Sequence, residues 1–228
     1  NREGAQGIMV NAGFMLLLSG AVLTVLGIAF HRPLLYLFGA SEVTYPYASS
    51  YIVIYLIGTL CVMLSLGLNP YINCQGFART GMLTVALGAA ANIVLDPIFI
   101  FALHLGVRGA AIATVLSQLL SAAWVVKFLT GKKAELKLDF RGFRPDWHCI
   151  QRITVLGIAS FVMSFTDTLV QVACNSMLRG FGGDLYISVM TVLNSVRQIA
   201  QTPVLAIADG ASTAISYNYG AGLYKRTR

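Results

Sequence analysis

The chain has 228 residues, of which 57% are hydrophobic and only 11% are charged. Soluble domains usually carry about 25% charged residues, so this composition excludes an ordinary soluble protein and favours a polytopic membrane protein. The net charge of +7 could suggest nucleic acid. However, the Lys and Arg residues flank apolar runs, and seven of them lie between residues 127 and 152. That pattern is typical of cytoplasmic loops, so we expect a lipid bilayer and no nucleic acid as the partner.

Six apolar runs are each long enough to cross a bilayer as a helix. In chain order they are residues 8–30, 47–68, 82–103, 109–129, 153–178 and 185–216. Transmembrane strands would need only about ten residues and would alternate in polarity, which these runs do not do. The sequence therefore predicts an all-α membrane protein with a helical bundle of six transmembrane spans.

The basic residues predict how these spans are oriented. With six spans, twelve of the sixteen Lys and Arg residues lie on the side that holds both chain ends, three lie on the other side, and Arg197 lies inside the sixth run. Cytoplasmic loops carry the excess of Lys and Arg. We therefore expect both ends to be cytoplasmic, in a plasma membrane or a bacterial inner membrane.

One long loop divides the chain into four spans and two spans. Residues 131–148 read GKKAELKLDFRGFRPDWH and mix charged with apolar side chains. We interpret this loop as a solvated cytoplasmic linker with an amphipathic piece at the membrane interface. It predicts a lobe boundary, with the end of one lobe at 1–130 and the start of the next at 149–228.

Asp96 is the sharpest candidate functional residue, because an ionised side chain inside a span costs about 2.5–3.5 kcal/mol on insertion scales. Asn92 lies four residues earlier, so the amide and the carboxylate share one helix face. Pro97 follows directly and cannot donate a hydrogen bond to the carbonyl oxygen of Ile93. The pattern therefore places several oxygen ligands close to the acid.

Thr114 is predicted to lie at the same depth as Asp96. The turn LHLGVRG is centred near Leu105 and makes the third and fourth runs an antiparallel hairpin. Asp96 and Thr114 are each nine residues from that centre, or about 13 Å along a helix. Carboxylate, amide and hydroxyl oxygens are ligands that a sodium ion accepts, and the carboxylate could instead bind a proton. The alternative is that these side chains make ordinary contacts between helices.

A second polar group lies near the centre of the fifth run. Asp167 shares a helix face with Gln171, and Arg197 is the basic residue inside the sixth run. These residues could form a second proton or substrate site, or they could belong to a structural network. By contrast, the glycine-rich GFGGD at 180–184 lacks the lysine of a phosphate-binding loop and is interpreted as a turn. The sequence contains no motif of a soluble enzyme.

Two segments resemble the multidrug and toxic compound extrusion (MATE) transporters, closest to their DinF-like branch. Residues 92–118, NIVLDPIFIFALHLGVRGAAIATVLSQ, are similar to the hairpin that joins the fifth and sixth helices of that family. Residues 215–226, ISYNYGAGLYKR, are similar to the segment that follows its eighth helix. Less specific matches are LFGAS at 37–41 and CQG with RTGM within 74–82. The resemblance covers essentially the whole chain.

The resemblance implies twelve helices in two six-helix lobes, around a cavity that alternates its access between the two sides of the membrane. This chain would supply the third to the eighth helix. Asn92, Asp96 and Thr114 match the cation site of the first lobe in that family. Asp167 follows Gly157 by ten residues, as an acid does in the NorM-like branch, although the proline that usually accompanies this glycine is missing.

The function implied is a secondary active antiporter that exports cationic or amphipathic organic compounds in exchange for protons or sodium ions. It would need no cofactor, would not be an enzyme, and would be a monomer at full length. Because the chain would hold four helices of one lobe and two of the other, we expect a fragment. Two alternatives stay open. One is a flippase for lipid-linked saccharides, which should have a strongly cationic cavity, and the other is a non-transporting, truncated membrane protein.

Overall fold

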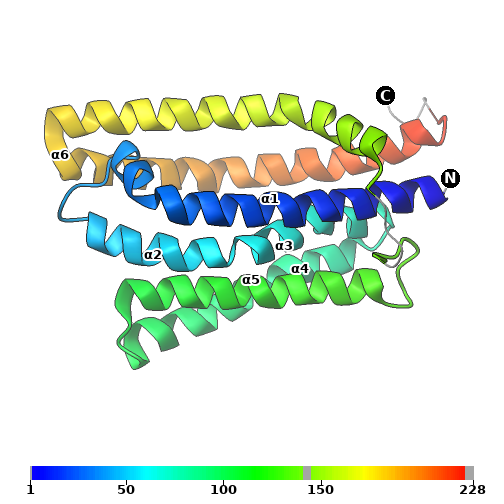
Figure 1. The fold of residues 1–228 in the computed structure, drawn as a ribbon, viewed down its shortest axis with the longest axis horizontal. Helices are drawn as coiled ribbons and strands as arrows, with labels where there is room; N and C mark the ends of the chain where they lie inside the picture. Colours follow the sequence, from blue (N-terminus) through cyan, green and yellow to red (C-terminus); the bar gives the residue numbers. More distant parts are fainter. Residues whose placement is uncertain (1, 141–144, 224–228) are drawn as a thin grey trace. The chain divides into compact units, whose positions relative to one another are not determined.

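The computed structural model describes residues 2–140 and 145–223, and every element in those ranges is helical (Figure 1). The chain divides into two compact units between Val170 and Gln171. The elements in chain order are α1 Arg2–Leu37, α2 Tyr45–Ile57, α3 Thr59–Cys74, α4 Ala78–Pro97, a π-helix η1 Ile98–Ala102, α5 Gly106–Thr130 and α6 Trp147–Gly220.

The helical membrane fold predicted from the apolar runs is confirmed. Four of the described helices are long and apolar enough to cross a membrane, and α2 with α3 adds a fifth span, bent by 55°. The continuous helix expected over 47–68 is therefore broken, and the break lies at Gly58. The predicted runs 153–178 and 185–216 both fall in α6. Gly183 between them has non-helical angles, φ 61° and ψ −150°, so the predicted turn separates two helical segments.

Gly58, at the bend, packs closely against α5. A Cβ atom at this position would lie 2.7 Å from a methyl group of Val115. Only glycine lets the two backbones approach so closely without displacing Val115. The glycine at the bend is thus part of a close contact between two helices, which the apolar composition of the run does not predict.

Three helices end in the same way, at glycines within the short motifs identified in the sequence. Gly39, Gly76 and Gly222 have φ values of 100°, 86° and 74°. In each case the residue after the glycine donates a backbone hydrogen bond to a carbonyl five residues back, which is the Schellman arrangement. The bonds are Ala40 to Leu35 at 2.9 Å, Phe77 to Ile72 at 3.2 Å and Leu223 to Asn218 at 2.9 Å.

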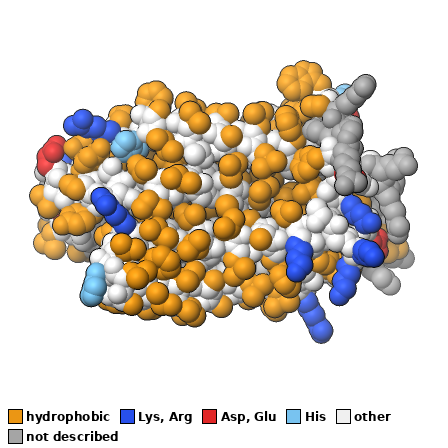
Figure 2. Space-filling model, turned by 60° about the horizontal axis from the view of Figure 1, so that its bottom comes forward, with side chains coloured by type: hydrophobic (Ala, Val, Ile, Leu, Met, Phe, Trp, Pro, Cys, Tyr) orange, Lys and Arg blue, Asp and Glu red, His pale blue; other side chains and the backbone are white. Residues whose placement is uncertain are grey.

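A hydrophobic cluster closes one end of the first unit, where α1, α3 and α5 meet the linker. Its buried members are Met9, Val10, Leu68, Ile72, Val125, Leu129 and Leu138. We call this the linker end of the bundle. Elsewhere the helices present many exposed apolar side chains, and hydrophobic groups cover most of the face shown in Figure 2. Such an apolar exterior is what a bilayer requires of the surface that it contacts.

The linker is less solvated than we expected. Leu138 is 7% exposed and Ala134 is 4% exposed. The backbone N–H of Leu138 donates to the carbonyl of Leu129 at 3.0 Å, and that of Leu136 donates to Gln75 Oε1 at 2.9 Å. The first half of the linker is therefore packed onto the bundle. The lobe boundary itself stays a prediction.

Candidate functional site

The predicted pair of Asn92 and Asp96 is formed on α4. Asn92 Nδ2 donates a hydrogen bond to Asp96 Oδ1 at 3.2 Å, and both side chains are half-buried. The carboxylate takes the donor end of the amide, because two acceptor oxygens facing each other would repel. This contact leaves Asn92 Oδ1 as the acceptor that points away from the carboxylate. The pair therefore offers one negative charge and one neutral oxygen within a single helical turn.

The backbone changes form directly after Asp96. Helix α4 ends at Pro97, and the π-helix η1 takes over from Ile98, with Leu103 donating to the carbonyl of Ile98 at 2.9 Å. Proline removes one hydrogen bond of the α-helical ladder, and π-helical turns are frequent at functional sites. The acid thus lies at the point where its helix departs from regular geometry.

The hairpin predicted between the third and fourth runs is present. Its turn contains Gly106 with φ 54°, and α5 then runs back along α4. A Cβ atom at Gly109 would lie 2.5 Å from the carbonyl oxygen of Phe99, so the two arms touch through backbone near the turn. This close approach fixes the register between Asp96 on one arm and Thr114 on the other.

Asn92 and Thr114 line the same cavity, which has a volume of about 220 Å³ and lies between α3, α4 and α5. The Thr114 hydroxyl donates to the carbonyl of Ala110 at 2.9 Å. Its proton is therefore engaged within α5, and its lone pairs remain for a ligand. Asp96 is not among the lining residues but is joined to the cavity through Asn92. The structure thus brings Asn92 together with Asp96 and with Thr114.

Sequence reasoning missed most of the polar lining of this cavity. The further polar residues are Ser65, Thr84, Ser117, Gln118 and Ser121. One signal was present in the sequence, because Thr114, Ser117 and Ser121 recur at intervals of three and four residues and so share one face of a helix. The lining residue from α3, Ser65, depends on how the helices pack and cannot be predicted from local spacing in the sequence.

Known proteins similar to this chain include multidrug transporters. The MatE family model matches residues 1–98. The multidrug export protein MepA of Staphylococcus haemolyticus is 26% identical over 203 residues, which are 89% of this chain and 45% of that protein. MepA of Staphylococcus aureus is 22% identical over 202 residues, again 89% and 45%.

Solved structures similar to this chain are also those of transporters. A multidrug resistance MATE family transporter in its outward-facing conformation matches with a TM-score of 0.84 and 27% identity, over 96% of this chain and 49% of that one. A multidrug resistance MATE family transporter in an inward-facing conformation matches with a TM-score of 0.83 and 26% identity, over 99% of this chain and 52% of that one. The chain is similar to MATE family transporters in both sequence and fold. It spans about half the length of the relatives that it matches.

This similarity confirms the expectation of a helical membrane protein that resembles a class of transporters rather than enzymes. The assignment to the DinF-like branch stays a prediction. So does the cation site at Asn92, Asp96 and Thr114, for which the hydrogen bond and the shared cavity described above are the structural support.

The second predicted site falls in α6. Asp167 and Arg197 have exposed side chains. Gln171 Nε2 donates to Asn175 Oδ1 at 3.3 Å, and Gln171 Oε1 accepts from Asn194 Nδ2 at 3.5 Å. Within the second unit these amides link the two helical segments on either side of the turn. The role of Asp167, Gln171 and Arg197 as a proton or substrate site stays a prediction.

The start of α6 is attached to α1 by a buried asparagine that sequence reasoning did not single out. Asn11 is 4% exposed, its Nδ2 donates to the carbonyl of Gly7 at 2.9 Å, and its Oδ1 accepts from the backbone N–H of Asp146 at 3.1 Å. Asp146 Oδ1 in turn accepts from the backbone N–H groups of His148 and Cys149, as the N-cap of a helix does. Two helices and the linker are thus joined through one side chain.

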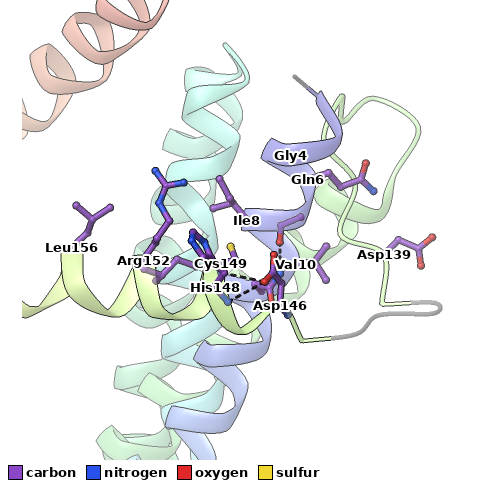
Figure 3. Close-up of a pocket in the computed structure, with 13 residues that line it drawn as sticks. Gly4, Gln6, Ile8, Val10, Asp139, Asp146, His148, Cys149, Arg152 and Leu156 are labelled. Carbon is purple, nitrogen blue, oxygen red and sulfur yellow. Dashed lines mark hydrogen bonds between the residues drawn. The ribbon is translucent and has the colours of Figure 1, made fainter.

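A pocket of about 750 Å³ adjoins this contact, and Figure 3 shows Asp146, His148, Cys149 and Arg152 along it. Burial raises the pKa of the Cys149 thiol, the negative charge of Asp146 raises it further, and Arg152 acts in the opposite direction. The thiol is therefore less ionised near neutral pH than an ordinary cysteine.

Proposed function

We propose that this chain works within a secondary active antiporter that exports cationic or amphipathic organic compounds in exchange for protons or sodium ions. The observation that carries the proposal is the hydrogen bond between Asn92 and Asp96 beside a polar cavity shared with Thr114. An acid, an amide and a hydroxyl gathered inside apolar helices are costly in lipid, and such groups usually mark an ion pathway.

In this proposal Asp96 supplies the charge for the coupling ion, while Asn92 Oδ1 and Thr114 Oγ1 supply neutral oxygens. A sodium ion would take all three as ligands, and a proton would need the carboxylate alone. No cofactor is required by this arrangement. Asp167, Gln171 and Arg197 are proposed as a second proton or substrate site in α6.

Coupling would arise because the ion and the exported compound stabilise different conformations. Neutralising Asp96 changes the electrostatics beside Pro97 and η1, where the helix lacks a regular hydrogen-bond ladder and can change its bend. The effect must be reciprocal, so that a bound ion weakens binding of the compound by the same factor by which the compound weakens binding of the ion.

The substrate class rests on the relatives, which are named as multidrug export proteins and multidrug resistance transporters. A saccharide–lipid flippase is less well supported, because no Lys or Arg among the described residues lines the cavity between α3, α4 and α5. The positive-inside pattern supports a cytoplasmic position for the linker end and for both ends of the chain.

The test is efflux of a fluorescent organic cation from cells that express the whole protein. Asp96→Asn should abolish ion-coupled efflux while membrane insertion stays intact. The control is Glu42→Gln, which neutralises an acid in the turn after α1, where it accepts a hydrogen bond from the Tyr36 hydroxyl. Wild-type efflux by Asp96→Asn would overturn the proposal. Repeating the assay with the pH gradient collapsed and sodium present, and then the reverse, identifies the ion.

A further inference from the structure

The cavity between α3, α4 and α5 continues well beyond the proposed ion site. Ser117 and Ser121 line it at three and seven residues after Thr114, so the polar lining of α5 extends about 10 Å from Thr114 toward the linker end. On α4, Thr84 lies eight residues before Asn92, which is about 12 Å in the same direction. The cavity is therefore elongated along the helices.

The hydroxyl groups of this lining are almost completely buried, yet each makes its bond to protein. Ser117 and Ser121 are 3% and 4% exposed, and they donate to the carbonyls of Ala113 at 2.8 Å and Thr84 at 3.0 Å. A hydroxyl that donates to a carbonyl retains its lone pairs as acceptors. The wall of the cavity thus presents hydroxyl oxygens, which suit water and small cations rather than apolar groups.

Ser65 on α3 lines one side of the cavity, and its hydrogen bond to Gln118 on α5 can break. Its hydroxyl lies 3.1 Å from the carbonyl of Val62 and 3.1 Å from Gln118 Oε1. One proton can serve only one of these acceptors at a time. The Gln118 side chain can therefore move away while Ser65 keeps a hydrogen bond to its own helix.

Two buried polar atoms near the linker end of the same three helices lack a partner among the described residues. They are Asn69 Oδ1 on α3, an acceptor, and Trp124 Nε1 on α5, a donor. Leaving such an atom unpaired costs about 1–3 kcal/mol. Asn69 is one turn from Ser65 on α3 and Trp124 is three residues from Ser121 on α5, so each follows a lining residue toward the linker end without lining the cavity itself. Water is the simplest group that would satisfy either atom.

We propose that this cavity is filled with water and is the route by which the coupling ion passes between Asp96 and the linker end of the bundle. Its volume of about 220 Å³ is large enough to hold several waters. This inference rests on the proposed antiport function for the identity of the ion. The hydration of the cavity does not depend on that function.

The first test measures access of Ag⁺, a small cation that reacts with thiolates, from the linker side of membrane vesicles. The whole protein carries Ser121→Cys in a background in which Cys61, Cys74, Cys149 and Cys174 are alanine. Leu120→Cys is the control, because Leu120 is the adjacent residue on α5 and is 46% exposed on the apolar surface. Thiols left unreacted by Ag⁺ are then counted with a maleimide after denaturation.

We expect Ser121→Cys to react with Ag⁺ at least about tenfold faster than Leu120→Cys, because a thiol ionises in water but not in lipid. Equal rates would show that the cavity is dry and would overturn the proposal. Thr84→Cys provides a second position on α4 and should also react quickly. The measurement uses no gradient and no exported compound. It can therefore fail while the ion site at Asp96 stands, and it should be unchanged by Asp96→Asn.

The second test asks whether the ion uses the cavity. Ser117→Leu fills the space next to Thr114, whereas Leu116→Phe adds bulk at the adjacent residue, which is 39% exposed and does not line the cavity. Ion-coupled efflux should fall at least about tenfold for Ser117→Leu and stay near wild type for Leu116→Phe, since only the first substitution displaces the water. Size-exclusion profiles of the two purified variants report their folding. Full efflux by a folded Ser117→Leu protein would overturn the role of the cavity as the ion route.

Discussion

Replacing Gly88 by alanine tests the packing between α4 and α5 that shapes the cavity. The added Cβ atom would lie 2.3 Å from Ser121 Oγ and 3.6 Å from Ser121 Cβ. The first distance is far inside van der Waals contact, whereas the second is ordinary contact. The clash is therefore with the hydroxyl alone. To relieve it, the Ser121 side chain must rotate and give up its 3.0 Å hydrogen bond to the carbonyl of Thr84.

The expected cost can be worked out from these two contributions. Overpacking of a well-packed contact costs about 1–3 kcal/mol, and loss of the hydrogen bond adds roughly 0.5–1.5 kcal/mol. Ser121→Ala alone should cost only the hydrogen bond. In the double variant Gly88→Ala with Ser121→Ala, the overpacking disappears because the nearest remaining atom of residue 121 is its Cβ. The double variant should therefore be as stable as Ser121→Ala alone.

The assay is the apparent melting temperature of the purified protein in detergent, measured for wild type, both single variants and the double variant. Gly88→Ala should be the least stable of the four, and the double variant should recover most of the loss. The interaction energy in this cycle should be about 1.5–4.5 kcal/mol, because both the clash and the separate loss of the hydrogen bond in Gly88→Ala disappear once residue 121 is alanine. Additive effects of the two substitutions would refute the assigned packing of α4 on α5.

Two further predictions concern the hairpin turn and the start of α6. Gly109→Ala should destabilise the protein more than Gly88→Ala, because its Cβ would lie 2.5 Å from the backbone oxygen of Phe99, which no side-chain rotation can relieve; an unchanged melting temperature would contradict this contact. Asp146→Asn should speed alkylation of Cys149 by iodoacetamide at neutral pH and Arg152→Gln should slow it, since the carboxylate raises the pKa of the thiol and the guanidinium lowers it. Asparagine caps a helix as well as aspartate does, so α6 should keep its start; opposite shifts in rate would contradict the assignment.

The spacing of residues along one helix was sufficient to predict the contact between Asn92 and Asp96 in the candidate site. Asn92 and Asp96 are four residues apart on one helix, and the 3.2 Å hydrogen bond between them is a direct consequence of helical geometry. Thr114 could be matched to their depth because a short turn fixes the register of a hairpin. The shared cavity of Asn92 and Thr114 agrees with that estimate.

Features that depend on a third helix were not predicted. Ser65 reaches Gln118 only because α3 packs on α5, and these residues are 53 positions apart in the sequence. The close contact of Gly58, at the bend, with Val115 is likewise not marked by any break in apolar composition. Such contacts are properties of the tertiary arrangement, and apolar runs alone carry little information about which of their faces meet.

In the linker, the basic composition was a misleading guide to burial. Its basic residues suggested a solvated segment, yet Ala134 and Leu138 form a small apolar pair that is buried at the linker end of the bundle. Lys132, Lys133 and Lys137 remain exposed between and beside them. The segment is thus both basic and docked, because only a few of its side chains need to be apolar to anchor it.

The central claim is that Asp96 binds the coupling ion in competition with the exported compound. It is tested most directly by adding a transported organic cation to the purified whole protein in weak buffer and recording the protons or sodium ions released. We predict that the wild type releases the ion stoichiometrically. The Asp96→Asn variant should still bind the compound but release no ion. Equal release by wild type and Asp96→Asn would contradict the claim, because the displaced ion would then come from another site.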